Sequence, residues 1–167
     1  MKNNKIIISR IDGEMLINMD TNYFEYIVYK NFIHLSKVNN GSNHSKKEIN
    51  RLCNSLNSFV LVATCNNQIV GYVLGEKINL QKFNVLDNRN VFYVTYLYTV
   101  PKFRKMGIGT TLLDCVTKTK KYKSNGIMLT FDTANRNLYD FYIKNKFSRD
   151  KLMTSGNRWD VYYRRYY

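Results

Sequence analysis

The 167-residue chain is predicted to fold as one α/β domain of the α+β type, with helices packed on a mixed central sheet. Strand-like runs and segments of helical periodicity follow one another in the order β-α-α-β-β-β-α-β-α-β. Two adjacent strands separated by Asn66-Asn67 indicate an antiparallel hairpin, whereas the later alternation of strand, helix and strand indicates a β-α-β unit. No linker or repeat interrupts this order, so we expect a single domain over residues 1–167.

The first half of the chain is expected to contain a strand, two helices and the hairpin. Residues 5–11 are mostly β-branched and predict the first strand. Apolar residues at helical spacing predict a helix over 22–35, and a capping pair predicts a second helix over 45–56. We expect the apolar face of this second helix to join the core through Ile49, Leu52, Cys53 and Leu56. Residues 59–64 and 69–74 predict the strands of the hairpin.

The second half begins with the longest β-rich run of the chain, residues 91–100. Pro101 follows and ends this strand, because proline lacks the backbone donor that a strand needs. The elements expected after it are a helix over 107–122, a strand over 127–131, a helix over 135–146 and a final strand over 159–166.

The composition favours a cytoplasmic protein without a metal. The 26 Lys and Arg residues against 12 Asp and Glu give a net charge of +14, but the lysines are spread along the chain, which is typical of a compositional bias. Three separated cysteines and two histidines predict neither a disulfide framework nor a zinc site. No apolar run reaches the roughly 18 residues of a membrane helix. We expect a soluble monomer or homodimer that binds no membrane, with nucleic acid a less favoured partner.

The loop before the 107–122 helix carries the main functional signal. Gly107 and Gly109 open a helix directly after a strand, and such a turn directs several N–H groups and the positive end of the helix dipole at one point. This arrangement favours a phosphate. The P-loop pattern G-x-x-x-x-G-K-[ST] is absent. A Rossmann dinucleotide site fits poorly, because Leu112 stands at the third glycine position and too little chain follows Asp132.

Two segments of the chain, in the right order, resemble the GNAT superfamily of acyl-CoA-dependent N-acetyltransferases. Residues 104–109, Arg-Lys-Met-Gly-Ile-Gly, fit the R/Q-x-x-G-x-G/A pyrophosphate loop and follow the Pro-x-aromatic at 101–103. Residues 135–147 resemble the N-x-x-A-x-x-L-Y-x-K-x-G-F segment, and 69–72 look like the third strand of the family. The resemblance implies a GNAT-like fold whose fourth and fifth strands splay apart, with acetyl-CoA as cosubstrate and no metal.

The resemblance also implies roles for individual residues. Leu97, Tyr98 and Thr99 would pair with the pantetheine arm, and the Thr99 region would polarise the thioester carbonyl. Asn135 would contact the cofactor, although it also fits a helix cap, and Tyr142 would act as general acid toward the departing thiolate, although it also fits a core aromatic. The loop residues implied in pyrophosphate binding are Arg104, Lys105, Met106, Gly107, Ile108, Gly109 and Thr110.

The chain departs from the family at the position of the general base. Many relatives carry a Glu on the fourth strand just before the Leu of an L-x-V motif, and this chain has Tyr96 there. Because an amine with a pKa of about 10.4 is mostly protonated at pH 7, some group must accept a proton. The candidates are Glu76, Tyr96, Asp132 and a chain of water molecules. Lys146 also replaces the Gly of the usual G-F ending.

These observations predict an N-acetyltransferase that moves an acetyl group from acetyl-CoA to a primary amine by direct attack in a ternary complex. One alternative is a catalytically weak acyl-CoA-binding module of the same fold, motivated by the missing acid on the fourth strand. Another is a basic nucleic-acid-binding protein, motivated by the net charge of +14. The sequence leaves the amine acceptor open, whether a small molecule or a protein amine.

Overall fold

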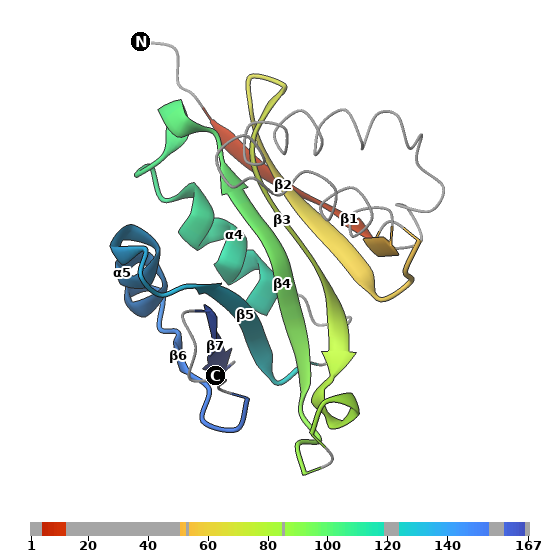
Figure 1. Cartoon of the computed structure of the whole chain (residues 1–167). Coiled ribbons are helices and arrows are strands. Elements are labelled where there is room, and N and C mark those ends of the chain that lie inside the picture. The colour runs from red at the N-terminus through yellow and green to blue at the C-terminus, as the bar shows by residue number, and fades with distance from the viewer. Residues whose placement is uncertain are drawn as a thin grey trace.

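The computed structural model of the chain describes residues 5–12, 51–52, 54–84, 86–118, 124–153 and 159–165. Their strands form a seven-stranded mixed sheet in the order β1-β2-β3-β4-β5-β7-β6 (Figure 1). The strands are β1 (Ile6–Asp12), β2 (Ser58–Cys65), β3 (Gln68–Asn79), β4 (Asn90–Thr99), β5 (Gly126–Asp132), β6 (Ser148–Arg149) and β7 (Trp159–Arg165). The helices are η1 (Leu80–Lys82), η2 (Pro101–Phe103), α4 (Ile108–Thr117) and α5 (Arg136–Lys144).

The helices predicted near the N-terminus fall mostly outside the described residues. The 22–35 helix lies wholly outside them, and of the 45–56 helix only the end is seen, where residues 51–52 are helical and Leu52 is buried. The prediction that Leu56 joins the core is wrong, since its side chain is 69% exposed. The N–H of Ser55 donates to the carbonyl of Leu52 at 3.1 Å and closes a turn, so the helical face does not extend to Leu56.

The predicted hairpin between β2 and β3 is confirmed. Asn66 and Asn67 have φ angles of 50° and 60°, the left-handed pair that a tight hairpin turn of type I′ requires. Strand β3 continues to Asn79, beyond the predicted end at residue 74. Pairing with β4 holds this extension, in which polar Glu76 and Lys77 obscure the strand pattern.

Strands β4 and β5 are parallel and splay apart, as predicted. They pair only where residues 91–93 face residues 126–128, and Figure 1 shows them diverging beyond that point. On its other side β4 pairs with β3 and carries a bulge, because Leu74 faces Tyr96 while Gly75 faces Val94, which leaves Thr95 extra. A Cβ on Gly75 would lie 2.0 Å from the Tyr93 carbonyl oxygen, so this close approach requires glycine.

The main core lies between one face of the sheet and helices α4 and α5, which both stand on that side in Figure 1. Helix α4 packs across β2, β3 and β4, and α5 packs against β5. Two smaller apolar clusters cover the opposite face, one around Tyr72 and Tyr98 and one around Leu80 and Met128.

The remaining elements differ from the predictions mainly at their ends. Helix α4 ends at Thr117, short of residue 122, with Lys118 as its cap. Helix α5 begins after Asn135 and ends at Lys144, inside the predicted 135–146. Strand β6 was not predicted, because two residues are too few to give a pattern, and it pairs with β7 at the edge of the sheet.

Candidate active site

The loop that leads into α4 presents a row of main-chain N–H groups. Among the described residues, no hydrogen-bond acceptor is found for the N–H groups of residues 105–110, and the first bond of the helix is donated by Thr111 to the Gly107 carbonyl at 2.9 Å. Lys105 and Gly107 have φ angles of 64° and 80°, which fold the chain into a concave turn. A turn of this kind at a helix N-terminus binds anions.

The two glycines of this loop serve different purposes. Gly107 adopts a positive φ that L side chains rarely take, while the space around it is open. Gly109 lies against α5, since a Cβ there would be 3.1 Å from Cζ of Phe141. Gly107 therefore allows the turn, and Gly109 allows α5 to approach α4.

The side chains of the loop point in several directions. Arg104 donates from Nε to the carbonyl of Thr99 at 3.1 Å and ties the loop to the end of β4. Ile108 is buried in the main core and anchors the start of α4. Lys105, Met106 and Thr110 are exposed.

Beyond the bulge, β4 has a strand on one side only. Leu97, Tyr98 and Thr99 pair with residues of β3, and no described strand pairs with them on the β5 side. Apart from the Thr99 carbonyl, which accepts from Arg104, main-chain groups along that edge are therefore available to an extended ligand.

Thr95 is a feature that the sequence reasoning missed. It is the extra residue of the bulge, and its Oγ1 is buried without a hydrogen-bond partner among the described residues. A buried hydroxyl without a partner is costly in a folded protein and needs an explanation. The one hint of the bulge in the sequence is Gly75, a glycine within a strand that pairs with a continuous run of strand-forming residues.

Tyr142 projects from α5 into the main core, with its ring 4.7 Å from that of Phe131 on β5. Its side chain is nearly buried, and its hydroxyl has no hydrogen-bond partner among the residues described. Burial raises the pKa of Tyr142 to about 12, because the phenolate would be poorly solvated. The hydroxyl is thus a protonated donor at neutral pH.

The end of α5 holds Tyr142 in place. Phe147 donates its N–H to the Tyr142 carbonyl at 3.0 Å, and Lys146 donates to the Ile143 carbonyl at 2.9 Å. This pattern is a Schellman motif, and Lys146 takes the left-handed position at φ 64° that glycine usually occupies. At the other end of α5, Asn135 accepts from the Leu138 N–H at 3.3 Å and caps the helix.

A cavity of about 450 Å³ opens on the face of the sheet opposite α4. Its lining residues are Arg51, Glu76, Ile78, Leu80, Lys82, Phe83, Tyr93, Met128, Thr130, Met153 and Val161. The hydroxyls of Tyr93 and Thr130 are hydrogen-bonded across β4 and β5, at the point where these strands begin to separate. The cavity therefore ends beside the gap between the two strands.

The candidate bases are not brought together. Glu76 lines the cavity, and Arg51 donates to both of its carboxylate oxygens, at 2.6 and 3.1 Å. Tyr96 packs in the apolar cluster around Tyr72, on the same face as the cavity but outside its described lining. Asp132 ends β5 and accepts from the Ala134 N–H at 3.0 Å.

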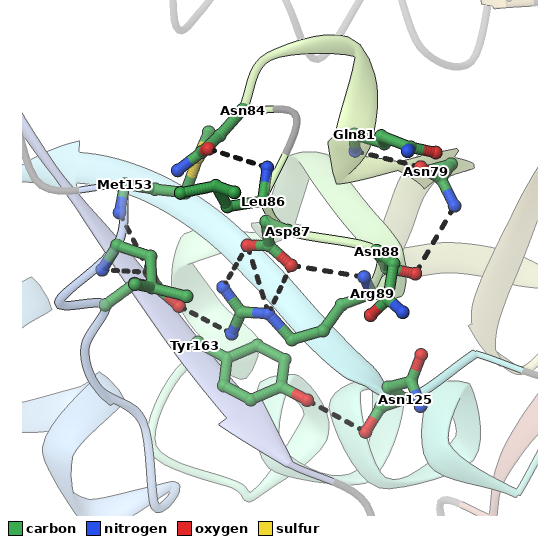
Figure 2. Close-up of polar contacts among 12 residues, drawn as sticks. Asn79, Gln81, Asn84, Leu86, Asp87, Asn88, Arg89, Asn125, Met153 and Tyr163 are labelled. Carbon is green, nitrogen blue, oxygen red and sulfur yellow. Dashed lines mark hydrogen bonds and ion pairs between the residues drawn. The ribbon is translucent and has the colours of Figure 1, made fainter.

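An ion-pair network lies beside two segments that line the cavity, and Figure 2 shows the contacts of Arg89 and Asp87 within it. Arg89 donates to Asp87 through Nε at 2.9 Å and to Asp150 through Nη1 at 2.8 Å, and its guanidinium lies 4.7 Å from the Tyr163 ring. Leu80 donates its N–H to the Arg89 carbonyl, while Asp150 accepts from the N–H of Met153. The network thus joins the η1 loop to the turn after β6.

Two further properties concern only the described parts of the chain. There, no cluster of three or more His, Cys, Asp or Glu side chains is arranged to hold a metal ion. In the same parts, no helix has the length and apolar character needed to cross a membrane.

Residues 29–147 match the family model of the Acetyltransferase (GNAT) family. The chain therefore belongs to this family of acetyltransferases, and the resemblance found in its sequence is confirmed. Comparison with curated protein sequences gives no significant match.

Solved structures share the fold at low sequence identity. Arabidopsis thaliana NAA60 in complex with acetyl-CoA has a TM-score of 0.66 and 14% identity over 95% of this chain and 97% of that one. PH1933 from Pyrococcus horikoshii has a TM-score of 0.66 and 18% identity over 96% and 98%. The aminoglycoside acetyltransferase meta-AAC0020 from an uncultured soil metagenomic sample, in complex with sisomicin, has a TM-score of 0.61 and 20% identity over 84% and 87%.

Proposed function

We propose that this protein transfers an acetyl group from acetyl-CoA to a primary amine by direct attack in a ternary complex. The observation that carries the proposal is the row of N–H groups at residues 105–110, beside the strand edge that β4 leaves unpaired. A diphosphate needs such donors, and the amide groups of pantetheine can pair with such an edge. Family membership and the acetyl-CoA complex of Arabidopsis NAA60 support the same donor.

In this proposal the loop residues 104–110 bind the diphosphate, mainly through main-chain N–H groups, with Arg104 and Lys105 adding positive charge. Leu97, Tyr98 and Thr99 offer the pantetheine arm their free edge. The Thr95 hydroxyl, buried at the bulge where β4 and β5 diverge, then faces the region of the thioester. Asn135 contacts the arm from the start of α5.

The chemistry requires two proton movements. The amine nitrogen attacks the acetyl carbon, the carbon–nitrogen bond forms and the carbon–sulfur bond breaks. Tyr142 donates its hydroxyl proton toward the departing sulfur, which its protonated state at neutral pH allows. The amine must lose one proton, and Glu76 is the acid we propose to accept it, directly or through water, since it lines the cavity. Tyr96 and Asp132 remain the other candidates.

The diphosphate site can be tested by removing one N–H group. Thr110 is exposed in the first turn of α4, where proline is tolerated because the N–H has no intrahelical partner. Thr110→Pro deletes that donor, while the matched control Thr110→Ala deletes only the hydroxyl. A hydrogen bond to a charged group contributes about 1.5–3 kcal/mol, so we expect affinity for acetyl-CoA to fall about 10- to 150-fold in the proline variant.

Calorimetry with acetyl-CoA on folded protein measures this difference. The alanine variant should stay within about threefold of wild type, because it keeps the main-chain donor. Equal affinity in all three proteins, or no binding by the wild type, would contradict the proposed diphosphate site.

A weakly active acyl-CoA-binding module is the second candidate. It is favoured by Glu76, whose carboxylate oxygens are both engaged by Arg51. Stabilisation by acetyl-CoA in thermal unfolding, together with no thiol release in the presence of a broad amine panel, would select this alternative.

A further inference from the structure

The charges around the cavity limit the kind of amine that it accepts. Glu76 is the carboxylate of the described lining, and Arg51 pairs with it, so the two charges cancel. Lys82 at the rim then leaves a surplus positive charge. Between the Glu76–Arg51 pair and Lys82 the floor of the cavity is apolar, and it consists of the buried side chains of Ile78, Leu80 and Met128.

The two ends of the cavity differ in their position along the sheet. The Tyr93 and Thr130 hydroxyls mark the end where β4 and β5 separate. Lys82 and Phe83 follow β3, whose last residue pairs with Asn90, three positions before Tyr93 on β4. At about 3.3 Å per residue, the end of β3, next to η1 with Lys82, lies roughly 10 Å from Tyr93 along the sheet. An unbranched chain of about eight carbons spans that length.

We propose that the acceptor is a monoamine with an apolar body. Its nitrogen lies at the Tyr93 end, its body covers the apolar floor, and its far end lies beside Lys82. A second ammonium at the far end meets the charge of Lys82 and finds no unpaired carboxylate in the described lining. The inference rests on the proposed function, because this cavity receives the acceptor only if the acetyl group is delivered where the strands part.

A matched pair of amines tests the inference. Octylamine and 1,8-diaminooctane differ only in the far ammonium. Their kcat/KM values are measured by thiol release from acetyl-CoA, and their Kd values by calorimetry on the protein saturated with coenzyme A. We expect octylamine to be favoured at least about tenfold in both, because the second ammonium of the diamine lies beside the like charge of Lys82 and has no unpaired carboxylate in the described lining.

Charge reversal at the rim should change this preference. Lys82→Glu is expected to narrow or invert the ratio between the two amines. Lys144→Glu makes the same change on the exposed end of α5, outside the described lining of the cavity, and should leave the ratio unaltered. Thermal unfolding verifies that both variants are folded.

The outcomes separate this inference from the proposed function. If the diamine is used or bound as well as octylamine, if neither amine binds, or if both variants shift the ratio equally, the inference is overturned. Acetylation of polyamines or aminoglycosides in preference to octylamine would overturn it while upholding the proposed function. If acetyl-CoA does not bind, or if no amine of any class is acetylated, the proposed function itself fails.

Discussion

Replacing Arg89 with methionine tests the network that joins the two loops beside the cavity. The side chains of Asp87 and Asp150 are 1% and 4% exposed, and the guanidinium of Arg89 contacts both. Removal of one partner from a buried ion pair leaves an uncompensated charge and costs about 3–5 kcal/mol. We therefore expect Arg89→Met to lower the free energy of unfolding at pH 7 by about 3–5 kcal/mol.

The effect should depend on pH in a defined direction. Hydrogen bonds from Arg89 hold the pKa of the Asp87 carboxyl below its ordinary value, against the opposing effect of burial. In the wild type this carboxylate stabilises the fold above the unfolded-state pKa of about 3.9, and its contribution is lost as the pH falls through the lowered pKa. In Arg89→Met the side-chain bonds are lost, while burial and the bond from the main-chain N–H of residue 89 remain, so the pKa of Asp87 rises and protonation relieves the penalty. The difference between the two proteins should shrink between pH 7 and pH 4.

Urea unfolding followed by circular dichroism, at several pH values in this interval, measures the difference. The control is Arg136→Met, the same chemical change at an exposed i,i+4 pair with Asp140, where we expect a loss below about 0.5 kcal/mol. A loss under about 1 kcal/mol at pH 7 for Arg89→Met, or one that does not vary with pH, would refute the view that Arg89 neutralises buried carboxylates.

Two further predictions concern the gap between β4 and β5. Tyr142→Phe should lower kcat about 100-fold or more with little change in the KM for acetyl-CoA. Because the pKa of Tyr142 is about 12, the wild-type kcat should rise as the acceptor amine deprotonates and show no decline below about pH 10 in steady-state assays. Thr95→Val should raise stability by about 1 kcal/mol, since it removes a buried hydroxyl without a partner, yet lower kcat/KM for acetyl-CoA. Unchanged turnover in Thr95→Val would mean that the hydroxyl does not serve the thioester.

Local patterns in the sequence predicted much of the fold. The Asn66-Asn67 turn and the glycine at position 107 dictate backbone conformations that few other residues allow, and both lie where expected. Apolar spacing correctly predicted helices α4 and α5, although Leu56 shows that spacing alone does not reveal where a helix stops.

Features that depend on contacts between residues far apart in the chain could not be predicted from the sequence. The bulge at Thr95 lies in a run where nearly every residue favours strands, so no alternation marks the extra residue. The contact between Arg89 and Asp150 joins residues 61 positions apart, and nothing local marks either one. The ion pair between Arg51 and Glu76 also joins residues that are distant in the chain, and it means that the candidate base Glu76 already has a charged partner.

The Schellman ending of α5 has a consequence for how the sequence around Tyr142 can vary. The direction of the Tyr142 side chain is fixed by the hydrogen bonds that end the helix, one turn further along. Each residue of an α-helix advances the side-chain direction by about 100°. A single insertion between 136 and 141 would therefore swing the phenol away from β5, or move the whole terminus. Substitutions at the exposed positions of this helix leave the direction of Tyr142 unchanged, whereas a change in the length of the helix does not.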